Sequence, residues 1–199
     1  MPLKAAAGQN RRGPSPGSPA SGAPPLQVEL VQGTAKGDKL ELVLQKGTEL
    51  GVNHFIICPT ERSIGRFKQD RLPGKAERWQ RIIQEAARQC GQSFLPALTI
   101  VESLGDALSA CSGEQRLVLW EQAETPLPSL LEGKKPATVS LLVGPEGGLT
   151  ENEVELAHSS GFNNVRLGPR ILRTETAGLA IVSILQYLYG DLASGAGAV

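Results

Sequence analysis

Residues 138–160, TVSLLVGPEGGLTENEVELAHSS, decide the fold class of this 199-residue chain. The run TVSLLVG is apolar on both faces, which is typical of a strand buried in a parallel sheet. Three glycines follow in GPEGG, and then come Thr150 and Glu153, whose spacing predicts a capping box at the start of a helix. A strand, a turn and a helix in direct succession indicate a fold of the α/β class.

The same alternation of strands and helices extends in both directions from this stretch. Short apolar runs predict further strands at 28–32, 54–59, 98–103, 116–121 and 163–168. Helical patterns are expected at 38–51, 75–89, 104–111 and 150–159, with a last helix that Thr174 is placed to cap. Asp38 and Glu41 again have capping-box spacing, and Trp79 shares a helical phase with Ile82 and Ile83, which predicts a core position. We therefore expect a mainly parallel sheet flanked by helices.

Composition narrows the class of protein. The chain is 40% apolar and 20% charged with no net charge, as in soluble globular proteins. No apolar run approaches the roughly 18 residues that a membrane span needs. Three widely spaced cysteines without a C-x-x-C pair indicate neither a disulfide framework nor a zinc site, and two isolated histidines indicate no metal site. These features favour a reducing compartment, and we expect a cytoplasmic protein that uses no metal.

The two ends of the chain differ from its middle. Residues 1–26 are rich in Pro, Gly, Ser and Ala, and such a stretch cannot bury enough apolar surface to order itself. We expect a disordered tail at 1–26, one domain at 27–192, and a flexible tail at 193–199. The first tail is basic and free of acids, so an organellar transit peptide is an alternative interpretation.

Three strand-to-loop junctions carry the residues that could form a site: WEQAE (120–124), GPEGG (144–148) and LGPRILRTETA (167–177). Ligands of open α/β sheets bind at the carboxyl ends of strands, so these junctions predict a shared site. GPEGG matches neither G-x-x-x-x-G-K-[ST] nor G-x-G-x-x-G, which disfavours the standard nucleotide sites. From the residues alone, GPEGG could equally be a simple turn, and the charges at 170–175 could be helix-end residues.

A longer set of motifs resembles a known family. VGPEGGLTENEVELAHSSGFNNVRLGPRILRTETA (143–177), LVLQKGTELGV (42–52), TERS (60–63) and ERWQRIIQEAARQCG (77–91) resemble the ribosomal RNA small subunit methyltransferase E family. Members of this family belong to the SPOUT superfamily and methylate N3 of a uridine in 16S ribosomal RNA, using S-adenosyl-L-methionine. The resemblance covers residues 28–190 and implies a trefoil-knotted α/β domain that works as a homodimer on small-subunit ribosomal RNA or the subunit particle.

The resemblance also implies roles for individual residues. The methyl donor would contact Gly144, Pro145, Glu146, Gly147, Gly148, Leu167, Gly168, Ile171, Leu172, Thr174 and Thr176. Our mechanistic hypothesis is that Arg173 supplies a cation to the uracil and that Glu175 is the proton acceptor or an orienting residue. RNA would contact Arg62, Arg66, Arg78, Arg88 and Arg170. From the residues alone, the basic run at 61–92, with eight Lys/Arg against four acids, could instead be a solvated helix face.

Two departures from the family keep alternatives open. Members normally carry an N-terminal RNA-binding domain of the PUA type, where this chain has the low-complexity stretch 1–26. Gln92 stands where a basic residue is usual. The alternatives are another SPOUT activity, such as ribose 2′-O-methylation, or a truncated, inactive RNA-binding or ribosome-assembly factor.

Overall fold

The computed structural model describes residues 24–36, 38–63 and 72–193. Its six strands are β1 (Gln27–Gly33), β2 (His54–Cys58), β3 (Ala97–Ile100), β4 (Gln115–Leu119), β5 (Thr138–Val143) and β6 (Asn163–Val165). Its helices are α1 (Lys39–Glu49), α2 (Leu72–Cys90), α3 (Leu104–Ser109), α4 (Leu127–Leu131), α5 (Glu151–Ser159) and α6 (Thr174–Tyr189). The strands form one sheet in the order β3-β2-β1-β5-β4-β6, and every neighbouring pair is parallel. The predicted α/β class with a parallel sheet is confirmed.

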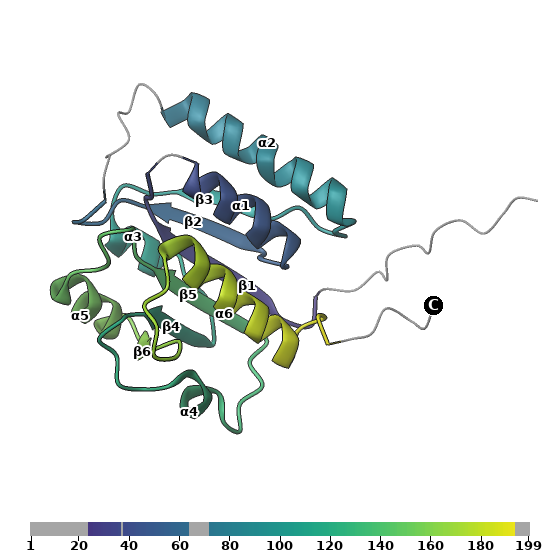
Figure 1. Ribbon diagram of the computed structural model, residues 1–199. Helices are drawn as coiled ribbons and strands as arrows, with labels where there is room; N and C mark the ends of the chain where they lie inside the picture. Colours follow the sequence, from purple (N-terminus) through teal and green to yellow (C-terminus); the bar gives the residue numbers. More distant parts are fainter. Residues whose placement is uncertain (1–23, 37, 64–71, 194–199) are drawn as a thin grey trace, which may run out of the picture.

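Helices cover both faces of the sheet (Figure 1). Helices α1, α2 and α6 lie side by side on one face, and α3 and α5 lie on the other. Successive residues of a strand point to opposite faces, so Leu30 packs into the core beneath α1 and α6, while Val31 packs into the core beneath α3 and α5. Because both faces are covered, the central strands are apolar throughout, as predicted from TVSLLVG.

The edge strand β3 is less buried than the central strands. Its four residues are exposed or only partly buried, because β3 has a single neighbouring strand, β2. Trp79 is 3% exposed and belongs to the core, as its helical phase predicted. The short helix α4 was not predicted from the sequence.

The helix amino termini show which of the predicted capping residues cap their helices in the structure. Thr150 and Glu153 form the predicted capping box at the start of α5. The box predicted for α1 is wrong: Asp38 makes no side-chain cap, and the Glu41 carboxylate instead accepts a 2.6 Å hydrogen bond from Arg78 of α2. The cap predicted for α6 is also displaced, because Arg173 is the N-cap and Thr174 is the first helical residue. In both cases a side chain that the sequence pattern assigned to capping, Glu41 or Thr174, bonds another element of the fold instead.

The domain begins slightly earlier than expected. Leu26, assigned from the sequence to the tail 1–26, is fully buried in the core. Residues 1–23 and 194–199, the greater parts of the two predicted tails, lie outside the described residues. Within the described part of the chain, no helix has the length and apolar character to cross a membrane. The trefoil knot that the resemblance implies stays a prediction.

Candidate functional site

The three junctions meet at the carboxyl edge of the sheet. Strands β5, β4 and β6 are neighbours, so the loops that follow them are brought together. They enclose a cleft of about 400 Å³, lined by Lys39, Leu119, Glu121, residues 143–149, residues 171–174 and Ala177. An adjoining hollow of about 90 Å³ is lined by residues 119–121, 165–167, 170–172 and Ala177. The two hollows share Glu121, Ile171 and Leu172, so they form one continuous candidate site.

The glycines of the GPEGG loop are required by the packing of the protein itself. A Cβ on Gly147 would lie 2.9 Å from the Cβ of Arg62 and 3.2 Å from the Arg62 carbonyl oxygen. Gly148 has a φ of +72°, a conformation that other residues rarely adopt. The Cβ and the carbonyl oxygen of Arg62, in the 60–63 turn, therefore exclude a side chain at position 147.

Arg62 braces the glycine loop from this turn. Its Nη1 donates hydrogen bonds to the carbonyl oxygens of Gly147 at 3.1 Å and Leu149 at 3.4 Å. Arg62 was predicted to bind RNA, and the guanidinium is exposed at the surface while it makes these bonds. Its contacts show that it also fixes one wall of the cleft.

A buried polar cluster joins the start of the glycine loop to β1 and α6. The Gln32 side-chain amide, at the end of β1, donates to the hydroxyl of Thr174 at 3.0 Å and to the carbonyl of Gly144 at 3.3 Å. The Thr174 hydroxyl in turn donates to the same Gly144 carbonyl at 2.5 Å. These bonds join β1, the glycine loop and the start of α6. Thr174 lines the cleft, but its hydroxyl is engaged in holding the site together.

A charged cluster lies at the end of the cleft beside α1. Lys39 Nζ is 3.2 Å from Glu146 Oε1 and 3.9 Å from Glu175 Oε2. Partial burial alone would raise the pKa of Glu146, but hydrogen bonds from its own backbone, from the Lys36 amide and from Lys39 hold that pKa below its usual value. Glu146 is therefore ionised at neutral pH beside the lysine.

The structure brings together most residues that the sequence assigned to the donor. Gly144, Pro145, Glu146, Gly147, Gly148, Ile171, Leu172 and Thr174 line the cleft, and Leu167 lines the adjoining hollow. Gly168 and Thr176 are absent from both linings; the Gly168 carbonyl instead accepts a 3.0 Å hydrogen bond from Arg166. Among the charged residues of the cleft lining, Glu121 and Lys39 were not assigned from the sequence. Glu121 lay within a recognised junction, whereas Lys39 gave no local signal.

The charged residues assigned to catalysis and RNA fall into separate places. Arg173 lines the cleft and Arg170 lines the hollow, but Glu175 lines neither. Arg78 and Arg88 project from α2, where Arg78 pairs with Glu41 and Arg88 bonds the Gln84 carbonyl of its own helix. Arg66 lies outside the described residues.

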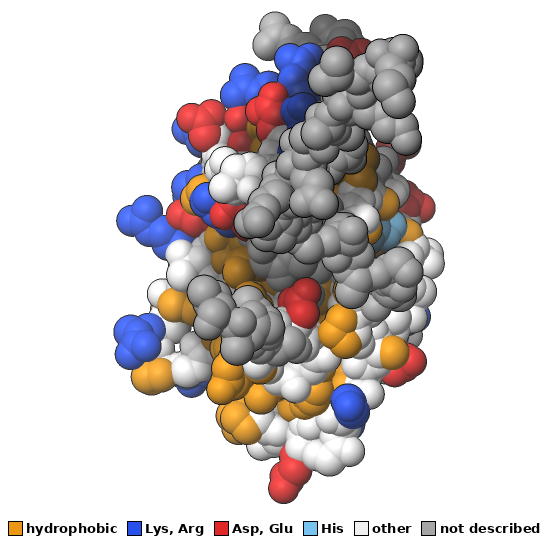
Figure 2. Space-filling view, turned by 90° about the vertical axis from the view of Figure 1, so that its right-hand side faces the viewer, with side chains coloured by type: hydrophobic (Ala, Val, Ile, Leu, Met, Phe, Trp, Pro, Cys, Tyr) orange, Lys and Arg blue, Asp and Glu red, His pale blue; other side chains and the backbone are white. Residues whose placement is uncertain are grey.

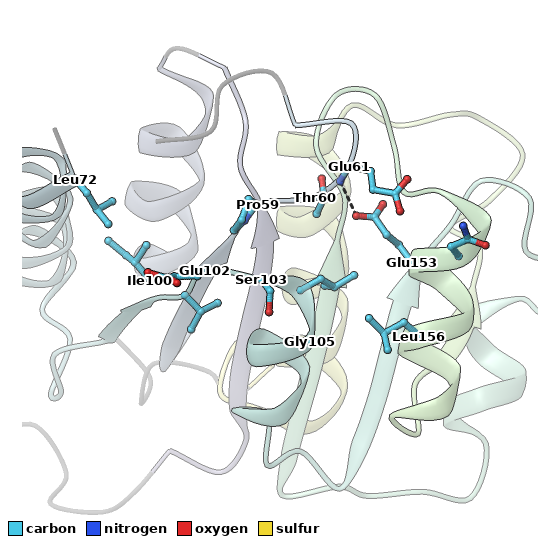
Figure 3. Close-up of a pocket in the computed structure, with 13 residues that line it drawn as sticks. Pro59, Thr60, Glu61, Leu72, Ile100, Glu102, Ser103, Gly105, Glu153 and Leu156 are labelled. Atoms are coloured by element: carbon cyan, nitrogen blue, oxygen red, sulfur yellow. Dashed lines mark hydrogen bonds between the residues drawn. The ribbon is translucent and has the colours of Figure 1, made fainter. Parts of the chain in front are cut away.

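A larger cavity, of about 760 Å³, opens on the other side of the 60–63 turn (Figure 3). It is lined by residues 59–61, 72, 100–105, 152, 153 and 156. The Glu61 amide donates to Glu153 Oε1 at 2.8 Å on its wall. Its described lining has acidic groups but no lysine or arginine, and no glycine loop. The smaller cleft, which has both cations and exposed loop backbone, is the better candidate for an anionic or cofactor-dependent substrate.

Buried thiols do not contribute a nucleophile. Burial raises the pKa of Cys58 to about 12 and that of Cys111 to about 11. Both therefore remain protonated at neutral pH, and both pack in the core beneath α3 and α5.

A family model for the RNA methyltransferase domain matches residues 23–186. The chain belongs to this RNA methyltransferase family. It is 39% identical over 170 residues to ribosomal RNA small subunit methyltransferase E of Bacillus subtilis, which covers 82% of this chain and 66% of that protein. The enzyme of the same name from Synechocystis is 38% identical over 157 residues, covering 77% of this chain and 50% of that protein. The resemblance inferred from the motifs is confirmed.

Solved structures of the family agree with the fold. Ribosomal RNA small subunit methyltransferase E from Neisseria gonorrhoeae, bound to S-adenosyl methionine, is 35% identical, with a TM-score of 0.77 over 88% of this chain and 71% of that one. A Legionella pneumophila protein solved in complex with SAM is 34% identical, with a TM-score of 0.80 over 85% of this chain and 69% of that one. The α/β fold of SPOUT type is confirmed. The chain spans between half and about two thirds of the length of the curated relatives named above.

Proposed function

We propose that this protein is an S-adenosylmethionine-dependent methyltransferase that modifies N3 of a uridine in small-subunit (16S) ribosomal RNA. One observation carries the proposal: the glycine loop 144–148 and the segment 171–174 line a single cleft, although they are separated by more than twenty residues. Two solved structures that are 34% and 35% identical to this chain contain the bound methyl donor.

The cleft has the chemical features that the methyl donor requires. Leu119, Ile171 and Leu172 supply apolar surface for an adenine ring, and the Ile171 side chain is 83% exposed in the free protein. Burying such a side chain against a ligand is favourable. The bare backbone of Gly147 and Gly148 admits close approach along the other wall. When bound, the donor supplies an electrophilic methyl group on a sulfonium.

Methylation at N3 makes two demands on the protein. N3 lies on the Watson–Crick edge of uracil, so the base must be unpaired or flipped to reach the cleft. N3 must also lose its proton, and negative charge then spreads to the uracil oxygens. Arg173, an exposed cation in the cleft lining, is placed to stabilise that charge. Glu175 lies behind the cleft lining, which favours the orienting role over direct proton transfer.

The proposal is tested by single-turnover methylation of small-subunit RNA, followed by mass analysis of the nucleosides. We expect N3-methyluridine, and Arg173→Ala should lower the rate at least tenfold because an electrostatic contact in the transition state is lost. Arg81→Ala on α2, which changes an exposed arginine outside the cleft lining, is the matched control. A 2′-O-methylated product would establish the alternative SPOUT activity, and Arg173→Ala at the wild-type rate would refute the role of Arg173.

A non-catalytic RNA-binding factor is the second candidate function. Calorimetry with S-adenosylhomocysteine separates the two candidates. A protein with an intact donor site should bind S-adenosylhomocysteine and show a heat of binding. A protein that has lost the donor site should show no heat of binding. Binding of RNA with no binding of S-adenosylhomocysteine would replace the methyltransferase proposal with this candidate.

We also infer that phosphate contacts contribute to RNA binding. Arg170 borders the hollow and Arg62 lies on the adjacent turn, so both are near the position of an RNA strand entering the cleft. The logarithm of the binding constant should then fall with the logarithm of salt concentration, with a slope of about −0.7 per single-strand phosphate contact. A salt-independent affinity would contradict this inference.

A homodimer is the proposed working form. Ile184, Tyr187 and Leu188 on α6 and Leu192 just after it are exposed apolar side chains, and Tyr187 is 63% exposed. Figure 2 shows hydrophobic side chains gathered in the lower half of the face that the end of α6 reaches. A contiguous exposed apolar surface is typical of an interface. Sedimentation should give a dimer that Tyr187→Glu shifts to monomer, and a monomeric wild type would refute the inference.

The proposed compartment is the cytoplasm. Cys58, Cys90 and Cys111 are all free thiols, which fits a reducing environment. Fractionation with an antibody to the protein would test this assignment, and recovery in an organelle would instead support the transit-peptide interpretation of residues 1–26.

A further inference from the structure

Lys39 lies where two segments of the site meet. It is the first residue of α1, it lines the cleft, and its Nζ contacts Glu146 of the glycine loop and Glu175 in the first turn of α6. Lys39 is more than a hundred residues away from either glutamate along the chain. The lysine is therefore placed to hold the glycine loop and α6 in a fixed relation.

The two carboxylates depend on Lys39 to different degrees. Glu146 Oε1 also accepts a 3.0 Å hydrogen bond from the Lys36 amide, so it keeps a partner without the lysine. Glu175 Oε2 is buried and, among the described residues, has no hydrogen-bond partner. The Lys39 ammonium, at 3.9 Å, is its recorded ion-pair partner. A buried carboxylate oxygen left without compensation is unfavourable, so Glu175 needs this cation to stay in place.

We propose that Lys39 is a positioning residue for methyl transfer. It holds the Glu175 carboxylate against α1. This contact keeps the start of α6 and the adjacent Arg173 in a fixed position relative to the glycine loop. This inference rests on the proposed methyltransferase function. A compact ammonium with three donors suits a site between two carboxylates from different segments. Small displacements of groups in a reaction site lower rates strongly, which is why a contact behind the cleft affects turnover.

The kinetic test compares Lys39→Met with Lys39→Arg. At saturating donor and RNA, Lys39→Met should lower the single-turnover rate at least tenfold while the affinity for S-adenosylhomocysteine stays within threefold of wild type. Lys39→Arg keeps the charge and should restore the rate to within threefold. Lys46→Met is the matched control, because Lys46 lies on the same helix and pairs with Glu49 at 2.8 Å outside the cleft lining.

Two kinetic outcomes would overturn the proposal. A wild-type rate in Lys39→Met would show that the lysine positions nothing. A large loss of S-adenosylhomocysteine affinity with an unchanged rate at saturation would show that Lys39 binds the donor directly. An arginine variant as slow as the methionine variant would also count against a role based on charge.

A second test needs no methylation activity. If Lys39 compensates a buried carboxylate, Lys39→Met should unfold at lower urea than wild type, and adding Glu175→Gln to that variant should raise the midpoint again. The neutral amide no longer needs a cation, so the double variant should be more stable than the single one. A double variant no more stable than Lys39→Met would overturn the proposal that Lys39 compensates the Glu175 carboxylate. Wild-type protein that binds S-adenosylhomocysteine but methylates no RNA would refute the proposed function and leave this stability test intact.

Discussion

Replacing Thr174 by valine tests whether the buried polar cluster holds the cleft together. Valine has nearly the same shape, so the packing of the side chain is retained while the hydroxyl is removed. The change deletes the 2.5 Å bond to the Gly144 carbonyl and the 3.0 Å bond from the Gln32 amide. Buried intramolecular hydrogen bonds each contribute about 0.5–1.5 kcal/mol to stability, so the expected loss is about 1–3 kcal/mol.

The groups left behind limit this loss. The Gln32 amide keeps the Gly33 carbonyl at 3.0 Å, and the Gly144 carbonyl keeps the Gln32 amide at 3.3 Å. Neither becomes an unpaired buried group, so the full desolvation penalty of a broken cluster does not apply. The glycine loop should nevertheless move more freely, and affinity for S-adenosylhomocysteine should fall together with stability.

Urea unfolding followed by circular dichroism measures the first effect, and calorimetry measures the second. Thr174→Ser is the control, because it keeps both hydrogen bonds and removes one methyl group, at a cost of at most about 0.8 kcal/mol. The valine variant should be the less stable of the two. If Thr174→Val were as stable as Thr174→Ser and bound the ligand equally well, the cluster would not support the cleft.

Two further predictions concern the packing of the glycine loop and the amino-terminal part of β1, away from the cleft. A Cβ on Gly33 would lie 2.8 Å from the Pro145 ring and 2.9 Å from its backbone nitrogen, so Gly33→Ala should destabilise by about 1–3 kcal/mol in urea unfolding. Gly74→Ala, with no atom within 4 Å of the new Cβ, should be neutral or stabilise by up to about 1 kcal/mol, and equal losses in both variants would refute the steric argument. Although burial opposes the shift, hydrogen bonds from Ser112 and Ser140 hold the pKa of Glu29 below its usual value of 4.5. A lowered pKa contributes stability that is present above pH 4.5 and is lost as pH falls through the folded-state value. Glu29→Gln should thus destabilise at pH 7 and lose its effect in more acidic solution, and a pH-independent difference would contradict this.

The sequence was sufficient to predict the architecture and the meeting of the three junctions. Apolar runs such as TVSLLVG alternate with helical patterns, and in parallel sheets the carboxyl ends lie at one edge. That rule predicts that GPEGG lies beside the junction 167–177, and residues of both segments line the cleft. The capping box of Thr150 and Glu153 was also predictable, because its partners are only three residues apart.

The contacts that shape the site could not be predicted in the same way. Gln32 and Thr174 are 142 residues apart, and Lys39 and Glu175 are 136 residues apart, so no local pattern reports either contact. Tertiary partners also overrode local capping signals: Thr174 bonds the glycine loop, and Glu41 bonds Arg78. The general rule for strand ends locates the site, but long-range partners decide the role of each side chain.

The parallel sheet has a practical consequence for experiments. Strand β1 enters the sheet at the edge opposite the cleft, and α6 ends near that same edge, where Gln186 bonds the Gly51 carbonyl (Figure 1). A purification tag or a surface-attachment handle joined before β1 would leave the domain away from the cleft, whereas one joined after α6 would lie beside the proposed dimer interface. Protein immobilised through a handle before β1 should consequently remain open to small ligands and to RNA, which makes surface-based binding assays practical.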